Sequence, residues 1–436
     1  MKTNQKIKFT EKTHEGAQAS RLTTEQQLRR SVMSCMLFED EFYEDGETIS
    51  SRINDLVKQL PFDKVADIAI EARTKMKLRH VPLWITCGLL KARHGGRKMG
   101  DLIYEVCQRA DEPAELLSMY WRDQQNAPLP SQLKIGLARA LGKFNEYNLA
   151  KYNRDGAVKL RDVLFLSHAK PKDKAQEALF KKIADNTLST PDTWEVALSG
   201  GADKKATFER LMAENQLGAL AFLRNLRNME QIGIAKSRIS EYGNSINLDK
   251  ILPFRFIAAA RAVPSWEDII EPWMLKALSS AEKLTGKTAI VVDNSGSMYY
   301  SRISSKSELT RSDAACALAI LVKEVCEDTI VIGFGNQADI IPNRRGFGLA
   351  DAIKRGPGGG TDTGNAIRLA NQKGYDRIIV ITDEQSHTQI GNPQGIGYFI
   401  NVANYKNGIG YGPWTHIDGW SESVIEYIKA AETSGD

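Results

Sequence analysis

The stretch Thr288-Ala-Ile-Val-Val-Asp-Asn-Ser-Gly-Ser297 decides the fold of the C-terminal part of the chain. Its first five residues are apolar or β-branched, which is typical of a strand buried on both faces of a parallel sheet. The residues that follow, from Asp293 to Ser297, are polar and include a glycine, as expected of a loop at the end of such a strand. Ligands of parallel sheets bind beyond the carboxyl ends of the strands. The same ten residues therefore predict both a strand and a binding site.

Strand-like and helix-like segments alternate from this stretch to the C-terminus. Further apolar runs at residues 329–334, 377–382 and 397–402 predict strands, and periodic segments at 309–327, 350–354, 364–373 and 422–431 predict helices. This alternation predicts a parallel sheet covered by helices on both faces. We therefore expect an α/β domain over residues 286–436.

Residues 1–285 have a different pattern, with one short amphipathic helix after another and no convincing alternating strand. Apolar residues recur at three- and four-residue spacing in residues 66–76, 84–93, 99–109, 113–124, 131–144, 176–186 and 204–215. Short turns that contain Gly, Pro or Asn separate these segments. Many short helices in succession predict an array of stacked antiparallel helix pairs.

Three polar clusters fall where strands of the predicted sheet end. Asp293, Ser295 and Ser297 follow the first strand, Thr361 lies in the glycine-rich loop 356–364, and Asp383 follows the strand at 377–382. These side chains offer oxygen ligands without His or Cys, and such ligands suit Mg²⁺ or Mn²⁺. The pattern predicts a divalent-cation site, with Mg²⁺ as the expected ion. The alternative is a set of helix-capping residues at strand-to-helix turns.

The positive charge of the chain is concentrated in one segment. The formal net charge is +4, yet residues 288–436 carry 13 Lys and Arg against 17 Asp and Glu. Residues 134–182 carry 12 basic against 5 acidic residues. Such a concentration attracts polyanions, although a solvated helical face has the same composition.

Several motifs together resemble a known family. They are Leu166-Ser-His-Ala-Lys-Pro171 within residues 159–171, the stretches 218–229 and 251–261, and the D-x-S-x-S pattern that begins at Asp293. In this combination the chain resembles the TROVE family of Ro autoantigen proteins and their bacterial relatives, from about Thr13 to Ala431. The C-terminal part resembles a von Willebrand factor A domain with its metal-ion-dependent adhesion site.

The resemblance implies a fold and a set of roles. The fold would be an α-helical, HEAT-like repeat ring with a basic central hole, joined at its ends by the von Willebrand factor A domain. Ser295, Ser297 and Thr361 would ligate the metal directly. Asp293 and Asp383 would ligate it directly or through water, leaving one position open for another oxygen.

The resemblance also implies RNA ligands. Y-like small RNAs would bind the outer surface of the ring, and single-stranded 3′ ends of misfolded noncoding RNA would thread the hole. Bacterial relatives can act with a 3′-to-5′ exoribonuclease. Expected RNA-contacting residues are Lys151, Arg154, His168, Lys170 and Lys172, together with Arg224 and Arg227. The last two either line the hole or belong to a buried hydrogen-bond network.

The leading hypothesis is thus an RNA-binding scaffold for RNA quality control or decay, without a catalytic group. The alternative is a metal-dependent protein-adhesion module without an RNA ligand. A hydrolase that uses Asp293 and Asp383 is a weaker reading, because no positioned base is recognisable; His387 and His416 have no evident partner. The longest apolar run is nine residues, too short to span a bilayer, so we expect a monomeric cytoplasmic protein.

Overall fold

The computed structural model describes residues 11–33, 37, 44–153, 156–190, 192–249, 251–279, 282–304, 307–403, 405–419 and 423–433. These residues form two compact units. One contains the described residues up to Glu47 together with those from Phe208 onward, and the other is Thr48–Thr207. The predicted domain boundary at residue 285 marks the change in sequence pattern. The two units are instead defined by which residues pack together, and their boundaries lie elsewhere in the chain. Helices from both ends of the helical part therefore belong with the sheet.

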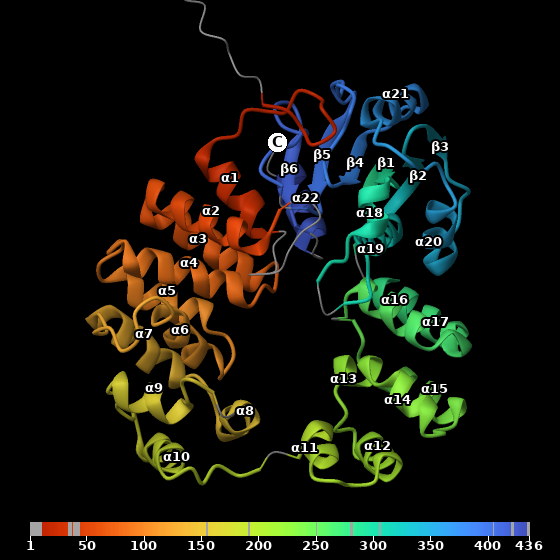
Figure 1. Ribbon diagram of the computed structural model, residues 1–436. Coiled ribbons are helices and arrows are strands. Elements are labelled where there is room, and N and C mark those ends of the chain that lie inside the picture. Colours follow the sequence, from red (N-terminus) through yellow and green to blue (C-terminus); the bar gives the residue numbers. More distant parts are fainter. Residues whose placement is uncertain are drawn as a thin grey trace, which may run out of the picture. The chain divides into compact units, whose positions relative to one another are not determined.

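A six-stranded sheet forms the C-terminal part, in the order β3-β2-β1-β4-β5-β6 (Figure 1). All neighbouring strands are parallel except β2 and β3. The four predicted strands are present, and the sequence analysis missed the two edge strands, of three and four residues. The strands are β1 (Leu284–Asp293), β2 (Cys326–Phe334), β3 (Ala338–Ile340), β4 (Arg377–Thr382), β5 (Ile396–Asn401) and β6 (Thr415–Asp418).

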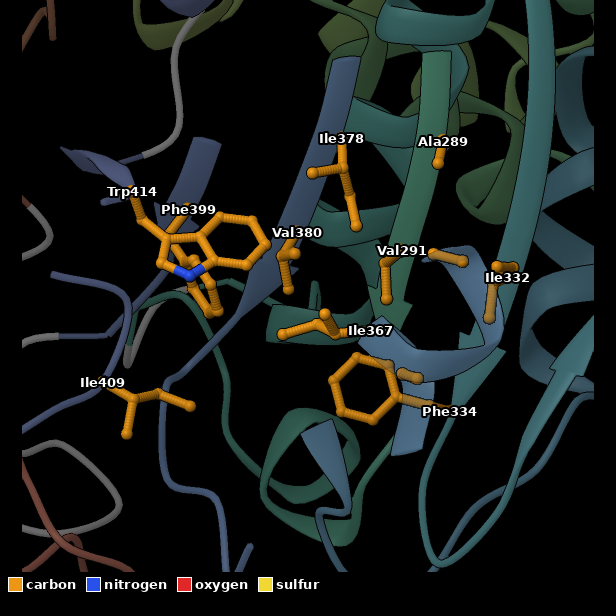
Figure 2. Packing of buried hydrophobic residues seen from close by; sticks show 12 residues of the cluster. Ala289, Val291, Ile332, Phe334, Ile367, Ile378, Val380, Phe399, Ile409 and Trp414 are labelled. Carbon is orange, nitrogen blue, oxygen red and sulfur yellow. The ribbon is translucent and has the colours of Figure 1, made fainter. Parts of the chain in front are cut away.

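Helices cover both faces of the sheet, as predicted. Figure 2 shows the core on one face, where Val291 of β1 and Val380 of β4 lie near Ile367 of α21. Helix α19 packs against β1 on the sheet and also against α16 and α17, and every residue of α19 except Lys323 is buried. The helices of the α/β part are α18 (Gly296–Tyr300), α19 (Arg311–Val325), α20 (Gly346–Lys354), α21 (Thr363–Lys373) and α22 (Ser423–Thr433).

Helices from both ends of the helical part pack on this α/β part. Helix α1 contacts β6, and α16 and α17 contact α19. Arg30 of α1 is completely buried there and forms an ion pair with Glu384, which follows β4. The helices of this group are α1 (Thr24–Met33), α13 (Ala219–Arg224), α14 (Leu226–Gln231), α15 (Lys236–Ser245), α16 (Pro253–Ala262) and α17 (Glu267–Ser279).

The second unit consists of short helices packed on their sequence neighbours, such as α3 on α4 and α9 on α10. In the described part of the chain, no helix is both long and apolar enough to cross a membrane. The helices, counting the two that cross the boundaries of the unit, are α2 (Gly46–Gln59), α3 (Phe62–Thr74), α4 (His80–Lys91), α5 (Lys98–Val106), α6 (Glu112–Tyr120), α7 (Ser131–Leu141), α8 (Glu146–Tyr152), α9 (Leu160–Leu166), α10 (Lys174–Ala184), α11 (Trp194–Ser199) and α12 (Lys204–Ala213).

All seven helices predicted within residues 1–285 are present, but they end two to four residues earlier than the periodicity predicted. Three of the predicted last residues, Arg93, Asn186 and Asn215, have positive φ angles of 56°, 54° and 52°. A residue in this left-handed conformation typically follows the last turn of a helix and closes it. The apolar period continues through such a turn, so periodicity alone places the end too late.

Candidate metal centre and nucleic-acid interface

Four of the five predicted metal ligands lie together at the carboxyl ends of β1 and β4. The backbone N–H of Ser295 donates to Asp293 Oδ1 at 2.8 Å, and the Ser295 and Ser297 hydroxyl oxygens are 3.2 Å apart. The Ser297 hydroxyl donates to Asp383 Oδ2 at 2.6 Å. Because β1 and β4 are adjacent parallel strands, their ends bring residues 86 positions apart into hydrogen-bond contact.

The glycine-rich loop reaches the same edge of the sheet and carries Thr361. The N–H of Gly296 donates to the carbonyl of Gly359 at 2.9 Å. On its other side the loop approaches Gly335, which directly follows β2. A Cβ atom on Gly335 would lie 2.4 Å from the backbone of Gly358, so the close approach of these two backbones requires glycine. The carbonyl of buried Thr361 accepts from the N–H of His387, in the loop after Asp383, and the N–H of Thr361 donates to His387 Nδ1. Thr361, the remaining predicted ligand, is thus hydrogen-bonded to the loop that contains Asp383.

The electrostatics of the cluster favour a bound cation. Asp293 and Asp383 are both fully buried, and burial together with the charge of Asp383 raises the pKa of Asp293 to about 7. Arg311 Nη1 is 3.9 Å from Asp383 Oδ2. Among the described residues, no three His, Cys, Asp or Glu side chains gather as a metal-binding group. A metal here would rely on hydroxyls beside two carboxylates, and this oxygen-only donor set fits Mg²⁺.

A buried ionic network beside this cluster was not predicted. The expectation that His416 has no partner is wrong: Nδ1 lies 3.1 Å from Glu384 Oε1, and Nε2 lies 3.0 Å from Asp418 Oδ1. Arg30 completes the network through its ion pair with Glu384 and a 3.1 Å hydrogen bond to the carbonyl of Asn407. The sequence holds no signal for a contact between positions 30 and 384. His387 is exposed but also has a partner, because its Nδ1 accepts from the N–H of Thr361 at 3.2 Å.

The described residues predicted to contact RNA near α8 and α9 form no ion pairs. Lys151 is half-buried near the end of α8, and His168, Lys170 and Lys172 are exposed in the segment that follows α9. Within the described ranges, no ion pair engages any of these four residues. The fifth predicted residue, Arg154, lies outside the described residues. Exposed Lys170 and Lys172 and half-buried Lys151 therefore have no acidic partner among the described residues.

His168 occupies the turn that closes α9. Its φ angle is +53°, its N–H donates to the carbonyl of Phe165 at 3.2 Å, and the N–H of Ala169 donates to Leu164 at the same distance. This pair of bonds is the Schellman arrangement, in which glycine is the preferred residue at the left-handed position. The turn leaves the imidazole exposed at the end of the helix.

Arg161 and Phe165 were not among the predicted contacts. They are four residues apart in α9, both are exposed, and this spacing places them on one face of the helix. A large aromatic residue at an outward position of an amphipathic helix is the signal that could have identified Phe165.

The structure excludes one of the two alternatives for Arg224 and Arg227. The stretch 218–229 forms two helices, α13 and α14, which meet at Asn225. Asn225 is buried, donates to the carbonyl of Ala221 at 2.8 Å and accepts from Asn228 at 2.9 Å. Both arginines are exposed, and Arg227 lies 3.5 Å from Glu308. The buried hydrogen-bond network therefore involves the asparagines and excludes the arginines.

Comparisons with known proteins agree with this architecture. Residues 182–284 match the TROVE domain family. The matched region contains two of the three helical motifs, 218–229 and 251–261, and ends where β1 begins. It excludes the motif with His168 and nearly all of the α/β part.

The fold of the chain is also similar to the crystal structure of the RO (RSR) protein of Deinococcus radiodurans. The similarity covers 92% of this chain and 97% of that chain, with a TM-score of 0.62 and 16% sequence identity. The predicted fold class, a helical array followed by an α/β domain with helices on both faces of its sheet, is confirmed at the level of the fold.

Proposed function

We propose that the protein is a Ro-like RNA-binding scaffold that holds a Y-like small RNA on the basic surface of α8 and α9. The observation that supports it most strongly is the set of cationic side chains without ion-pair partners among the described residues: Lys151, Lys170 and Lys172, with His168 between them in sequence. Lys side chains that neutralise phosphates release counterions and supply affinity that does not depend on base sequence. Structured RNA is recognised mainly through its shape and phosphates.

The test is a filter-binding titration of a Y-like stem–loop RNA against the double variant Lys151→Ala, His168→Ser. We expect weaker binding and a shallower dependence of affinity on salt, because one cation and one hydrogen-bonding side chain are lost. The control variant, Lys58→Ala with His80→Ser, makes the same chemical change in α2 and α4, where Lys58 is paired with Asp55 at 3.3 Å. Equal affinity of the two variants would contradict the assignment.

Single-stranded 3′ ends of misfolded noncoding RNA are the second proposed ligand, with Arg224 and Arg227 as the contacting residues. Both guanidinium groups are exposed, and Arg224 has no acidic partner within the described ranges. Arg224→Ala should weaken binding of an unstructured oligonucleotide more than binding of the stem–loop. A 3′-to-5′ exoribonuclease is the class of partner that such a scaffold serves in the cytoplasm. The RNA-bound protein would be monomeric.

We propose that Asp293, Ser295, Ser297, Thr361 and Asp383 hold Mg²⁺. The ion would supply a Lewis-acidic position for an anionic oxygen of a partner. Calorimetric titration with Mg²⁺ should give a binding isotherm for the wild type that Ser295→Ala abolishes. Ser301→Ala is the matched control, because Ser301 directly follows α18 and makes no hydrogen bond through its hydroxyl in the described structure. Identical isotherms for the wild type and Ser295→Ala would refute the metal assignment.

The same oxygen cluster favours a second candidate function, a metal-dependent adhesion module that binds the carboxylate of a partner protein. The hydrogen bonds that gather Ser295, Ser297 and Asp383 support this reading independently of any RNA. Binding of a partner that is lost with EDTA but insensitive to salt and ribonuclease would favour it over the scaffold.

A further inference from the structure

Helix α9 carries an exposed aromatic ring, close in sequence to the unpaired basic residues. Phe165 is 54% exposed, although it belongs to a helix whose other large apolar residues, such as Leu160 and Leu164, pack into the core. Burying a phenylalanine stabilises a protein by roughly 1.5–3 kcal/mol relative to leaving it exposed. The fold of α9 gains little from this ring at this position, because the ring contributes to no described core cluster.

The neighbours of the ring are those of a nucleotide-binding surface. The guanidinium carbon of Arg161 lies 5.6 Å from the centre of the Phe165 ring, one helical turn earlier on the same face. His168 lies in the turn that closes α9, three residues after Phe165, and exposed Lys170 and Lys172 follow it in the sequence. No acidic side chain pairs with Arg161 among the described ion pairs. An exposed aromatic ring with a guanidinium beside it and further basic residues in the next turn fits an anionic chain that also carries flat aromatic groups, which describes RNA with an unpaired base.

We propose that Phe165 is a stacking platform for an unpaired RNA base, with Arg161 and His168 positioned to contact the adjacent phosphates. The proposal rests on the proposed RNA-binding function and deepens it, because it assigns a ligand group to a residue outside the predicted contacts. Lys151, Lys170 and Lys172 neutralise phosphates of any RNA, paired or unpaired. Phe165 distinguishes RNA with a single-stranded loop from a continuous duplex, since bases inside a duplex are already stacked on each other.

The experiment compares two RNA probes of equal length and charge: a stem–loop with an unpaired loop, and a blunt duplex. Phe165→Ala should bind the stem–loop about 5- to 150-fold more weakly, the range expected for loss of one base–aromatic contact. Its affinity for the duplex should be unchanged. Phe165→Trp should retain stem–loop affinity, and Phe165→Leu should lose most of it, because Leu is apolar but has no π-face. Tyr427→Ala, which removes a half-exposed aromatic ring from α22, is the control.

The outcomes separate this proposal from the proposed function. If the wild type binds neither probe, the RNA-binding function fails. If the wild type binds the stem–loop and Phe165→Ala binds it equally well, the stacking role fails while the scaffold function stands. An equal loss on both probes would also overturn stacking, since it would indicate disturbance of the phosphate contacts. Phe165-dependent self-association in light scattering, with unchanged RNA affinity, would assign the ring to a protein partner instead.

Discussion

Replacing His168 with glycine separates a role in RNA binding from a role in the fold. His168 adopts φ +53° at the end of α9, where a side chain with a Cβ atom is strained. The left-handed conformation costs an L-residue about 1–2 kcal/mol. Glycine removes that cost but loses about 0.5–1 kcal/mol through its freer unfolded chain. We therefore expect His168→Gly to leave the free energy of unfolding unchanged or to raise it by up to about 1.5 kcal/mol.

RNA binding should change in the opposite direction. Loss of one hydrogen bond of roughly 0.5–1.5 kcal/mol predicts about 2- to 12-fold weaker binding of the stem–loop RNA. Urea unfolding and filter binding in one buffer measure both quantities. Arg93→Gly is the matched control, because exposed Arg93 has the same left-handed geometry, with φ 56°, at the end of α4. It should share the effect on stability but leave RNA affinity nearly unchanged.

A specific result would refute this reasoning. If His168→Gly lowers the free energy of unfolding by more than about 1 kcal/mol, which exceeds the error of such extrapolations, and leaves RNA affinity unchanged, then His168 is a structural helix-end residue. The exposed imidazole would then have to stabilise the turn through contacts that the described geometry does not contain.

Three other perturbations test the fold around the site. Arg30→Met should lower the free energy of unfolding by about 3–5 kcal/mol in urea, because it removes the arginine partner of buried Glu384, and the added change Glu384→Gln should restore part of the loss. Gly335→Ala should lower it by about 1–3 kcal/mol, and should weaken Mg²⁺ binding in calorimetry, because the new Cβ meets the backbone of Gly358. Burial raises the pKa of Glu115 to about 7, so the wild type should lose stability relative to Glu115→Gln as the pH of urea titrations rises from 5 to 8; a constant difference would contradict this.

The sequence predicted those parts of the fold whose signals are local and repeated. A run such as Ile378–Ile381 is buried on both faces of the sheet, so its composition alone predicts a central strand. The edge strands β3 and β6 have only three and four residues, and β3 is mostly exposed, so hydrophobic patterning carried no signal for them. Their existence depends on a neighbouring strand that presents an unpaired edge.

The residues of the candidate sites also fall into those that a sequence rule predicts and those that it does not. The strand-end rule predicts from the sequence that Asp293 and Asp383 lie at one edge of the sheet, because parallel strands end together. No comparable rule reaches Arg30, which lies in an amphipathic helix and is separated from Glu384 by 354 positions. Phe165 was not predicted as a contact residue for another reason. Periodicity identifies which residues are buried, so an exposed ring can be recognised only once the outward face of α9 is known.

The loop after β4 explains why the first residues of the described chain matter to the metal cluster. Asp383 accepts from Ser297 on one side of this loop, while the next residue, Glu384, turns with φ 63° toward Arg30. Farther along, the carbonyl of Ser386 accepts from the Thr13 hydroxyl at 2.7 Å, and the side chain of Gln385 accepts from the N–H of residue 14 at 2.7 Å. A backbone held from both sides has little freedom to reorient the Asp383 carboxylate. The N-terminal segment therefore acts as the outer support of the oxygen cluster, although it contributes none of the oxygen atoms.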